Sequence, residues 1–215
     1  LDLLFAGNRF FVQGRFPASQ DVYYNLTFQA PDGDIEAILK LLPEESAKKI
    51  RDFKPSGQFA FSGILEGRDT DTSNPNFELE FVTQDGALNA SVFGAKLSNL
   101  DMKGSFSNGE QNAAHTAKIK LQEVQGNLNG RPFHATMALS RLDDPYVRTT
   151  LDASVNLRDL PTVQKIPLRK RPEGLVFVDV SFAGMIDDLK QRRTIDQLDI
   201  TGEIRFDSVA LYPKQ

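Results

Sequence analysis

The chain has 215 residues, enough for one sizeable β domain or two small ones, and its 40% of hydrophobic residues can build a core. Its formal charge of −4 comes from mixed acids and bases with only short basic clusters, so nucleic acid is not an expected partner. The lack of cysteine excludes disulfides and thiolate chemistry, and no run of about 18 apolar residues could cross a membrane as a helix.

Apolar and polar residues alternate along most of the chain, which is typical of strands with one dry and one wet face. Turn signals separate these runs at residues 84–86, 107–109 and 128–130. We therefore expect a mainly β fold, a long antiparallel and strongly curved sheet that forms either a β-groove or an open sandwich. The expected strands cover residues 24–28, 58–64, 77–81, 88–93, 100–106, 118–124, 133–139, 151–157, 175–182 and 198–206.

One segment, residues 34–51, has helical rather than alternating spacing. Ile35, Ile38, Leu39 and Leu42 fall on one helical face, and Pro43 suits the first turn of a second short helix. We expect a bent helical segment that covers apolar surface at one end or face of the sheet.

We treat residues 1–215 as one β-rich module with a possible sub-boundary at 159–173. Pro161, Pro167 and Pro172 exclude a central strand there, and the strands that follow could continue the sheet or begin a second subdomain. The chain opens on Leu1-Asp2-Leu3-Leu4-Phe5, which reads as the middle of a strand. We expect the module to be a fragment of a larger protein.

An apolar-x-Gly-x-apolar pattern recurs at residues 102–106, 124–128 and 200–204. Because the step is two residues, each glycine lies on the same face as its apolar neighbours. A missing side chain there leaves room for a bulge, for curvature, or for a group pressed against the backbone. Curvature is the simpler interpretation, and a gap that faces a ligand is the alternative.

The residues offer little support for catalysis. The two histidines, His115 and His134, belong to no triad-like or zinc-like pattern, and we expect His134 on the wet face of its strand. The run from Asp69 to Glu80 has partial calcium-loop spacing but lacks the required glycine, so a hairpin tip is the better interpretation. We expect a protein that is not an enzyme, with no cofactor and no metal.

The run Phe133–Leu139, the turn Asp144-Pro145-Tyr146 and the strand from Leu151 toward Leu160 resemble the AsmA-like family of bacterial envelope proteins. Residues 98–104 and 124–130 are similar to the short Leu-x-Gly and Gly-x-Leu repeats of that family. The resemblance covers roughly residues 53–160 well and the rest loosely. It implies a periplasmic module of the repeating β-groove lipid-transfer group, which supports outer-membrane assembly. The inner-membrane anchor would lie in segments outside this chain, and the family has no catalytic residues to carry over.

The leading hypothesis is therefore a module that binds or conducts phospholipid or another acyl lipid on the concave face of the sheet. The alternative is a structural or protein-binding β-sandwich domain that contacts other domains of the same envelope protein. A glycan-active enzyme or carbohydrate binder is the third hypothesis, although tryptophan is absent. An open apolar surface would favour the first and a closed core the second. The candidate lipid-groove residues are Phe59, Phe61, Leu100, Met102, Phe106, Met137, Leu139, Val155 and Leu157.

Overall fold

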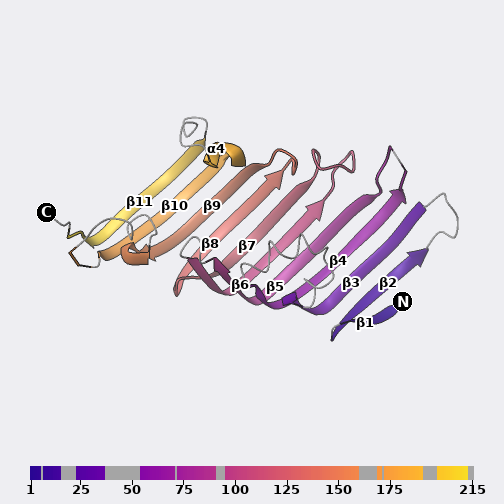
Figure 1. The fold of residues 1–215 in the computed structure, drawn as a ribbon, viewed down its shortest axis with the longest axis horizontal. Helices are drawn as coiled ribbons and strands as arrows, with labels where there is room; N and C mark the ends of the chain where they lie inside the picture. Colours follow the sequence, from indigo (N-terminus) through magenta and orange to yellow (C-terminus); the bar gives the residue numbers. More distant parts are fainter. Residues whose placement is uncertain are drawn as a thin grey trace.

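The structure is a computed structural model that describes residues 1–5, 7–15, 23–36, 54–70, 72–90, 95–159, 169–170, 172–190 and 198–212. These residues form one antiparallel sheet of eleven strands whose order in space is their order along the chain (Figure 1). The strands are β1 (Asp2–Phe5), β2 (Asn8–Arg15), β3 (Tyr23–Asp34), β4 (Ser56–Arg68), β5 (Asn76–Ala90), β6 (Ala95–Ser107), β7 (Lys118–Leu128), β8 (Arg131–Ser140), β9 (Tyr146–Asn156), β10 (Glu173–Met185) and β11 (Asp199–Ala210).

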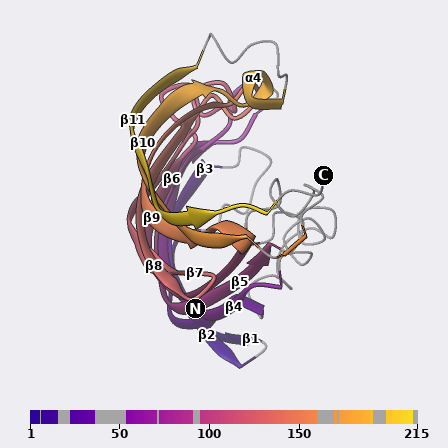
Figure 2. The same cartoon turned by 90° about the vertical axis from the view of Figure 1, so that its left-hand side faces the viewer.

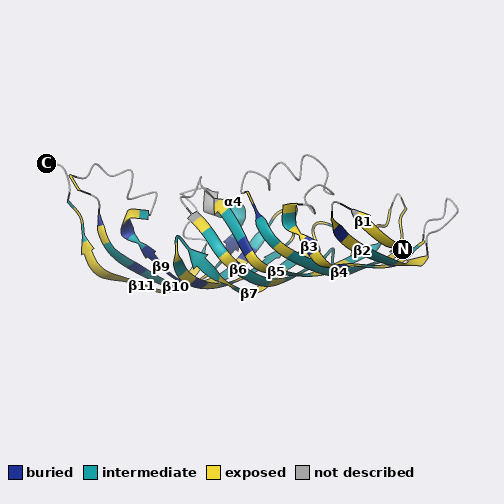
Figure 3. Ribbon diagram, turned by 90° about the horizontal axis from the view of Figure 1, so that it is seen from below, coloured by how far each residue is buried: buried dark blue, intermediate teal, exposed yellow. Residues whose placement is uncertain are grey.

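The expected mainly β antiparallel meander is confirmed, but the expected strong curvature is wrong. The strands arch toward one side (Figure 2), and the described strands form a single layer when the sheet is seen from below (Figure 3). The sheet is nevertheless not strongly curled or closed, because β1 and β11 are its two ends and do not pair with each other. It is an open, shallow trough.

The expected helix at residues 34–51 falls mostly outside the described residues. Asp34 itself ends β3, where its backbone N–H donates to the side-chain Oδ1 of Asn8 at 2.8 Å. Only Ile35 and Glu36 are described as helical in this segment. Residues 37–53 are not described, so the rest of this prediction is untested.

Two short helical elements were not expected. Helix α4 (Ile186–Lys190) follows β10, and the 3-10 turn η2 (Leu157–Asp159) follows β9. The assignment of Leu157 to a strand is therefore wrong by one residue. Elements of three and five residues are shorter than the windows in which helical periodicity can be recognised.

Two of the three expected turns are confirmed and one is wrong. Asn108 and Gly109 follow the end of β6, as expected. Asn129 and Gly130, with φ of 52° and 81°, form the expected two-residue hairpin between β7 and β8. The Asp85-Gly86 pair instead lies inside β5, where the pairs Thr83↔Met102 and Gly86↔Leu100 enclose a bulge. Asp85 has a φ of 50°, and its N–H donates to the Asp101 side chain at 3.0 Å. A residue that tolerates positive φ suits a bulge as well as a turn.

The strands after the proline-containing connection continue the same sheet. Strand β10 pairs with β9 from Leu175↔Asn156 to Met185↔Tyr146, and β11 pairs with β10. Of residues 159–173, the structure describes only 159, 169–170 and 172–173. The order β9-β10-β11 shows that the chain returns to the sheet beside the strand it left.

The recurrent glycines serve close packing on one face of the sheet. Gly63 and Gly104 stand directly opposite Phe28 and Phe81, and a Cβ atom on either glycine would collide with the facing phenyl ring. A Cβ on Gly126 would come within 3.0 Å of the carbonyl oxygen of Asn99, inside the β6 bulge. The glycines thus provide room for rings pressed against the backbone and for bulges, rather than for the strong curvature that was the simpler interpretation of the spacing.

We expect Gly104→Val to destabilise the fold by about 1–3 kcal/mol, because the new side chain must displace the Phe81 ring that covers this position. Urea unfolding followed by circular dichroism measures the change. The matched control is Ser105→Val, one residue further along β6 and on the opposite face. Equal stability of Gly104→Val and the unmodified chain would show that the ring does not occupy this position.

Candidate functional site: an open apolar face

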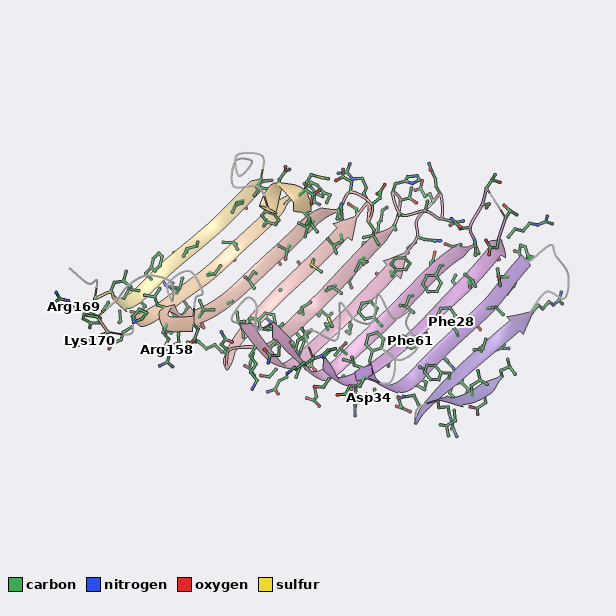
Figure 4. The ribbon with its side chains drawn as sticks, viewed as in Figure 1. Phe28, Asp34, Phe61, Arg158, Arg169 and Lys170 are labelled. Carbon is green, nitrogen blue, oxygen red and sulfur yellow. The ribbon has the colours of Figure 1, made fainter. Side chains whose placement is uncertain are left out.

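One side of the sheet is apolar from β2 to β11. The pairing registers place a row of side chains on this side, one from each strand, and we call this side the apolar face. It is the side toward which the strands arch (Figures 2 and 4). The row consists of Val12, Phe28, Phe61, Phe81, Met102, Leu121, Met137, Leu151, Val178 and Ile204.

The opposite side of the sheet is polar. Neighbours of the row, such as Lys120, His134 and Arg205, alternate onto it and are exposed. The predicted wet-face position of His134 is confirmed, and His134 stands opposite Asp152 of β9.

A broad depression of about 1300 Å³ crosses β2 to β6 on the polar side and includes residues such as Ser62 and Glu80. Among the described residues, no group of three or more His, Cys, Asp or Glu side chains could hold a metal ion.

Within the described part of the chain, no second sheet covers the apolar face. Most of its large side chains are half-buried, and at the β11 end Ile204 and Phe206 are 56% and 62% exposed. The accessible surface is 14678 Å², about one and a half times the roughly 9,900 Å² expected for a compact monomer of this size. The chain therefore presents far more surface than a closed sandwich would.

A cluster of phenylalanines dominates the apolar face between β2 and β6. Phe28 of β3 stacks on Phe77 of β5 with ring centroids 5.7 Å apart, although strands two apart are separated by about 9.6 Å. The rings bridge this gap over Gly63 of β4, and Phe61 contacts Phe28 at 6.2 Å (Figure 4). The cluster consists of Phe10, Phe28, Phe59, Phe61, Phe77, Phe81 and Phe106.

Toward β11 aliphatic side chains outnumber rings on the apolar face. Leu100, Phe133 and Ala153 form one buried cluster, with Met102, Val124 and Leu151 packed against it. Val155, Leu157 and Val176 form a second cluster at the end of β9 and β10. Side chains thus gain burial from neighbours on the same face.

The structure places eight of the nine candidate groove residues on the apolar face. Leu157 is the exception because it belongs to η2, where it is 5% exposed and packs on Val155 and Val176. The eight are Phe59, Phe61, Leu100, Met102, Phe106, Met137, Leu139 and Val155.

Several prominent residues of this face were not among the candidates. Phe77 and Phe81 lie in one of the clearest alternating runs, and Phe28 ends another, so the signal was present within each strand. What the sequence lacks is the register between strands, which decides whether alternating residues of two strands share a side.

Comparison with known proteins adds nothing to the functional argument. Searches against profiles of protein families, curated proteins and solved structures find no match for this chain. Among the described residues no helix is long and apolar enough to cross a membrane.

One polar group on the apolar face is fully buried. Thr83 of β5 is 1% exposed, and its Oγ1 has no hydrogen-bond partner among the residues that the structure describes. The residue lies opposite Phe59 on one side and Met102 on the other, so both of its cross-strand neighbours are apolar. A buried hydroxyl without a partner lowers stability.

We expect Thr83→Val to stabilise the protein by about 1 kcal/mol, because valine keeps the shape and removes the unpaired hydroxyl. The shift of the urea midpoint measures the effect. A useful control is Thr136→Val on the exposed side of β8, which breaks a 2.8 Å hydroxyl contact with Thr150 and should not stabilise. A loss of stability in Thr83→Val would mean that the hydroxyl has a partner in solution.

Proposed function

We propose that this chain is a non-catalytic periplasmic module of an AsmA-like envelope protein, and that it binds or conducts lipid acyl chains along the apolar face in support of outer-membrane assembly. The observation that carries the proposal is the continuity of that face from β2 to β11 without a covering layer among the described residues. Large contiguous apolar surface that is exposed to solvent marks a binding surface.

The dimensions of the face fit acyl chains. Strands β4, β6 and β10 have 13 residues each, which corresponds to about 43 Å of extended chain. Ten strand spacings of about 4.8 Å give a width of about 48 Å across the sheet. A sixteen-carbon chain is about half as long as either dimension, so several could lie on the face together.

The energetics also favour hydrocarbon over a polar ligand. Each methylene removed from water contributes about 0.8 kcal/mol, so complete shielding of a sixteen-carbon chain is worth on the order of 10 kcal/mol. The row from Val12 to Ile204 contains only aliphatic, aromatic and thioether side chains. These groups give a hydrocarbon chain no fixed hydrogen-bonding position, which suits movement along the sheet.

The proposal is tested by organic extraction of the purified chain and lipid mass spectrometry, compared with a control protein purified identically. We expect acyl lipid in stoichiometric amounts with the unmodified chain. Met137→Glu, which puts a charge in the middle of the apolar face, should lower the bound lipid by about tenfold or more. His134→Glu, on the polar side of the same strand, should leave it unchanged.

Lipid at the level of the control protein would overturn the proposal and favour the structural or protein-binding module instead. Equal lipid in Met137→Glu and His134→Glu would also contradict it, because the bound lipid would then not lie on the apolar face. Circular dichroism of both variants shows whether each retains the sheet.

A further inference from the structure

Three cations gather at one corner of the sheet, where β9 ends and β10 begins. Arg158 belongs to η2, directly after β9, and Arg169 and Lys170 shortly precede β10. Figure 4 shows all three at this corner, far from Phe28 and Phe61. We call Arg158, Arg169 and Lys170 the basic corner.

Local contacts position these cations at the surface. The backbone N–H of Arg169 donates to the carbonyl oxygen of Tyr212 at 2.7 Å, and the Lys170 ammonium lies over the Tyr212 ring at 5.5 Å. Nε of Arg158 lies 3.8 Å from Oδ1 of Asp159. All three cationic residues are exposed, so their charged groups can meet a ligand that approaches from solvent.

The basic corner borders an aliphatic part of the apolar face. Val155, Leu157 and Val176 are buried there and pack together, and Leu157 directly precedes Arg158 in the chain. From this cluster, alternate residues of β10 continue the apolar face toward the middle of the strand, with Val178 packed against the cluster. A path of aliphatic side chains thus begins directly beside the cations.

The opposite end of β9 and β10 is acidic among the described residues. Asp143-Asp144 lies in the turn between β8 and β9, close to Arg141, and Asp187-Asp188 lies in α4 after β10. The basic corner has instead three cations beside the two carboxylates of Asp159 and Glu173. A ligand that lies along β9 and β10 therefore meets opposite charge at its two ends.

We propose that the basic corner binds the anionic headgroup of an acyl lipid whose hydrocarbon chain lies along β9 and β10 on the apolar face. This inference rests on the proposed function, to which it adds the charge of the headgroup and the direction of the bound lipid. Guanidinium and ammonium groups bind phosphate oxygens through charge-assisted hydrogen bonds. The carboxylates at the opposite end repel the same headgroup and disfavour the reversed orientation.

The length of the strand fits this orientation. Strand β10 has 13 residues, about 43 Å of extended chain, and a sixteen-carbon acyl chain spans about half of that length. With its headgroup at the basic corner, the methyl end of the lipid lies near Val180, which stands opposite Leu151 of β9. The hydrocarbon therefore stays on aliphatic side chains and ends before the acidic connections.

Competition between two lysophospholipids tests the proposal. Lysophosphatidylglycerol has a net negative headgroup, whereas lysophosphatidylcholine has a zwitterionic one, and both can carry the same acyl chain. The purified protein is mixed with equal amounts of the two lipids, free lipid is removed, and bound lipid is quantified by mass spectrometry. We expect about tenfold more of the anionic lipid at low salt and a smaller excess at high salt, because salt screens exposed charges.

Charge reversal locates the headgroup site. Arg158→Glu combined with Lys170→Glu should bring the ratio of the two lipids to about one or below, and should leave the binding of lysophosphatidylcholine alone unchanged. The matched control is Lys120→Glu combined with Arg148→Glu, which changes the net charge equally on the polar sides of β7 and β9. This control should keep the excess of anionic lipid. Unchanged binding of lysophosphatidylcholine also shows that the corner variant folds.

The outcomes separate this inference from the proposed function. Equal binding of the two lipids by the unmodified protein would overturn the headgroup site and leave acyl-chain binding standing. An excess that survives in the corner variant, or that is lost in the control, would likewise overturn the site. Binding of neither lipid would overturn the proposed function and the headgroup site together.

Discussion

A sheet of one layer can shield its apolar side chains only against neighbours on the same face. Here that shielding comes from rings and aliphatic groups that lean across strand boundaries, as when Phe28 reaches Phe77 over Gly63. Each such contact depends on the pairing register and on a position without a side chain. The arrangement explains why most large apolar residues are half-buried rather than enclosed, and why the described residues leave the face open to an apolar ligand.

Bulges reconcile this packing with long strands. Asp85, Asn99 and Glu123 have positive φ inside β5, β6 and β7, at the places where the registers shift. A bulge bends its strand and re-aims the side chains that follow. The apolar alternation therefore resumes on the same side after each bulge, and the apolar face stays continuous across these three strands.

Alternation, turn residues and glycine spacing were sufficient to predict an antiparallel meander with one apolar side, and eight candidate groove residues lie on that side. Three features needed the structure. The sequence did not show that residues 76–90 form one bulged strand, since Asp85-Gly86 is equally suited to a turn. It did not show the register that assembles the phenylalanine cluster. It also did not show how far the sheet curls, because curvature depends on the sum of small twists and bulges over all strands.

The most direct test of the open apolar face uses the absence of cysteine in this chain. Single cysteines at Leu121 and at Lys120 would lie next to each other on β7 but on opposite faces. We expect a water-soluble maleimide to modify both in lipid-free protein, and added acyl lipid to slow only the reaction at position 121. An unreactive thiol at position 121 in folded, lipid-free protein would show a closed core. Equal rates at position 121 with and without lipid would show that acyl chains do not occupy the face.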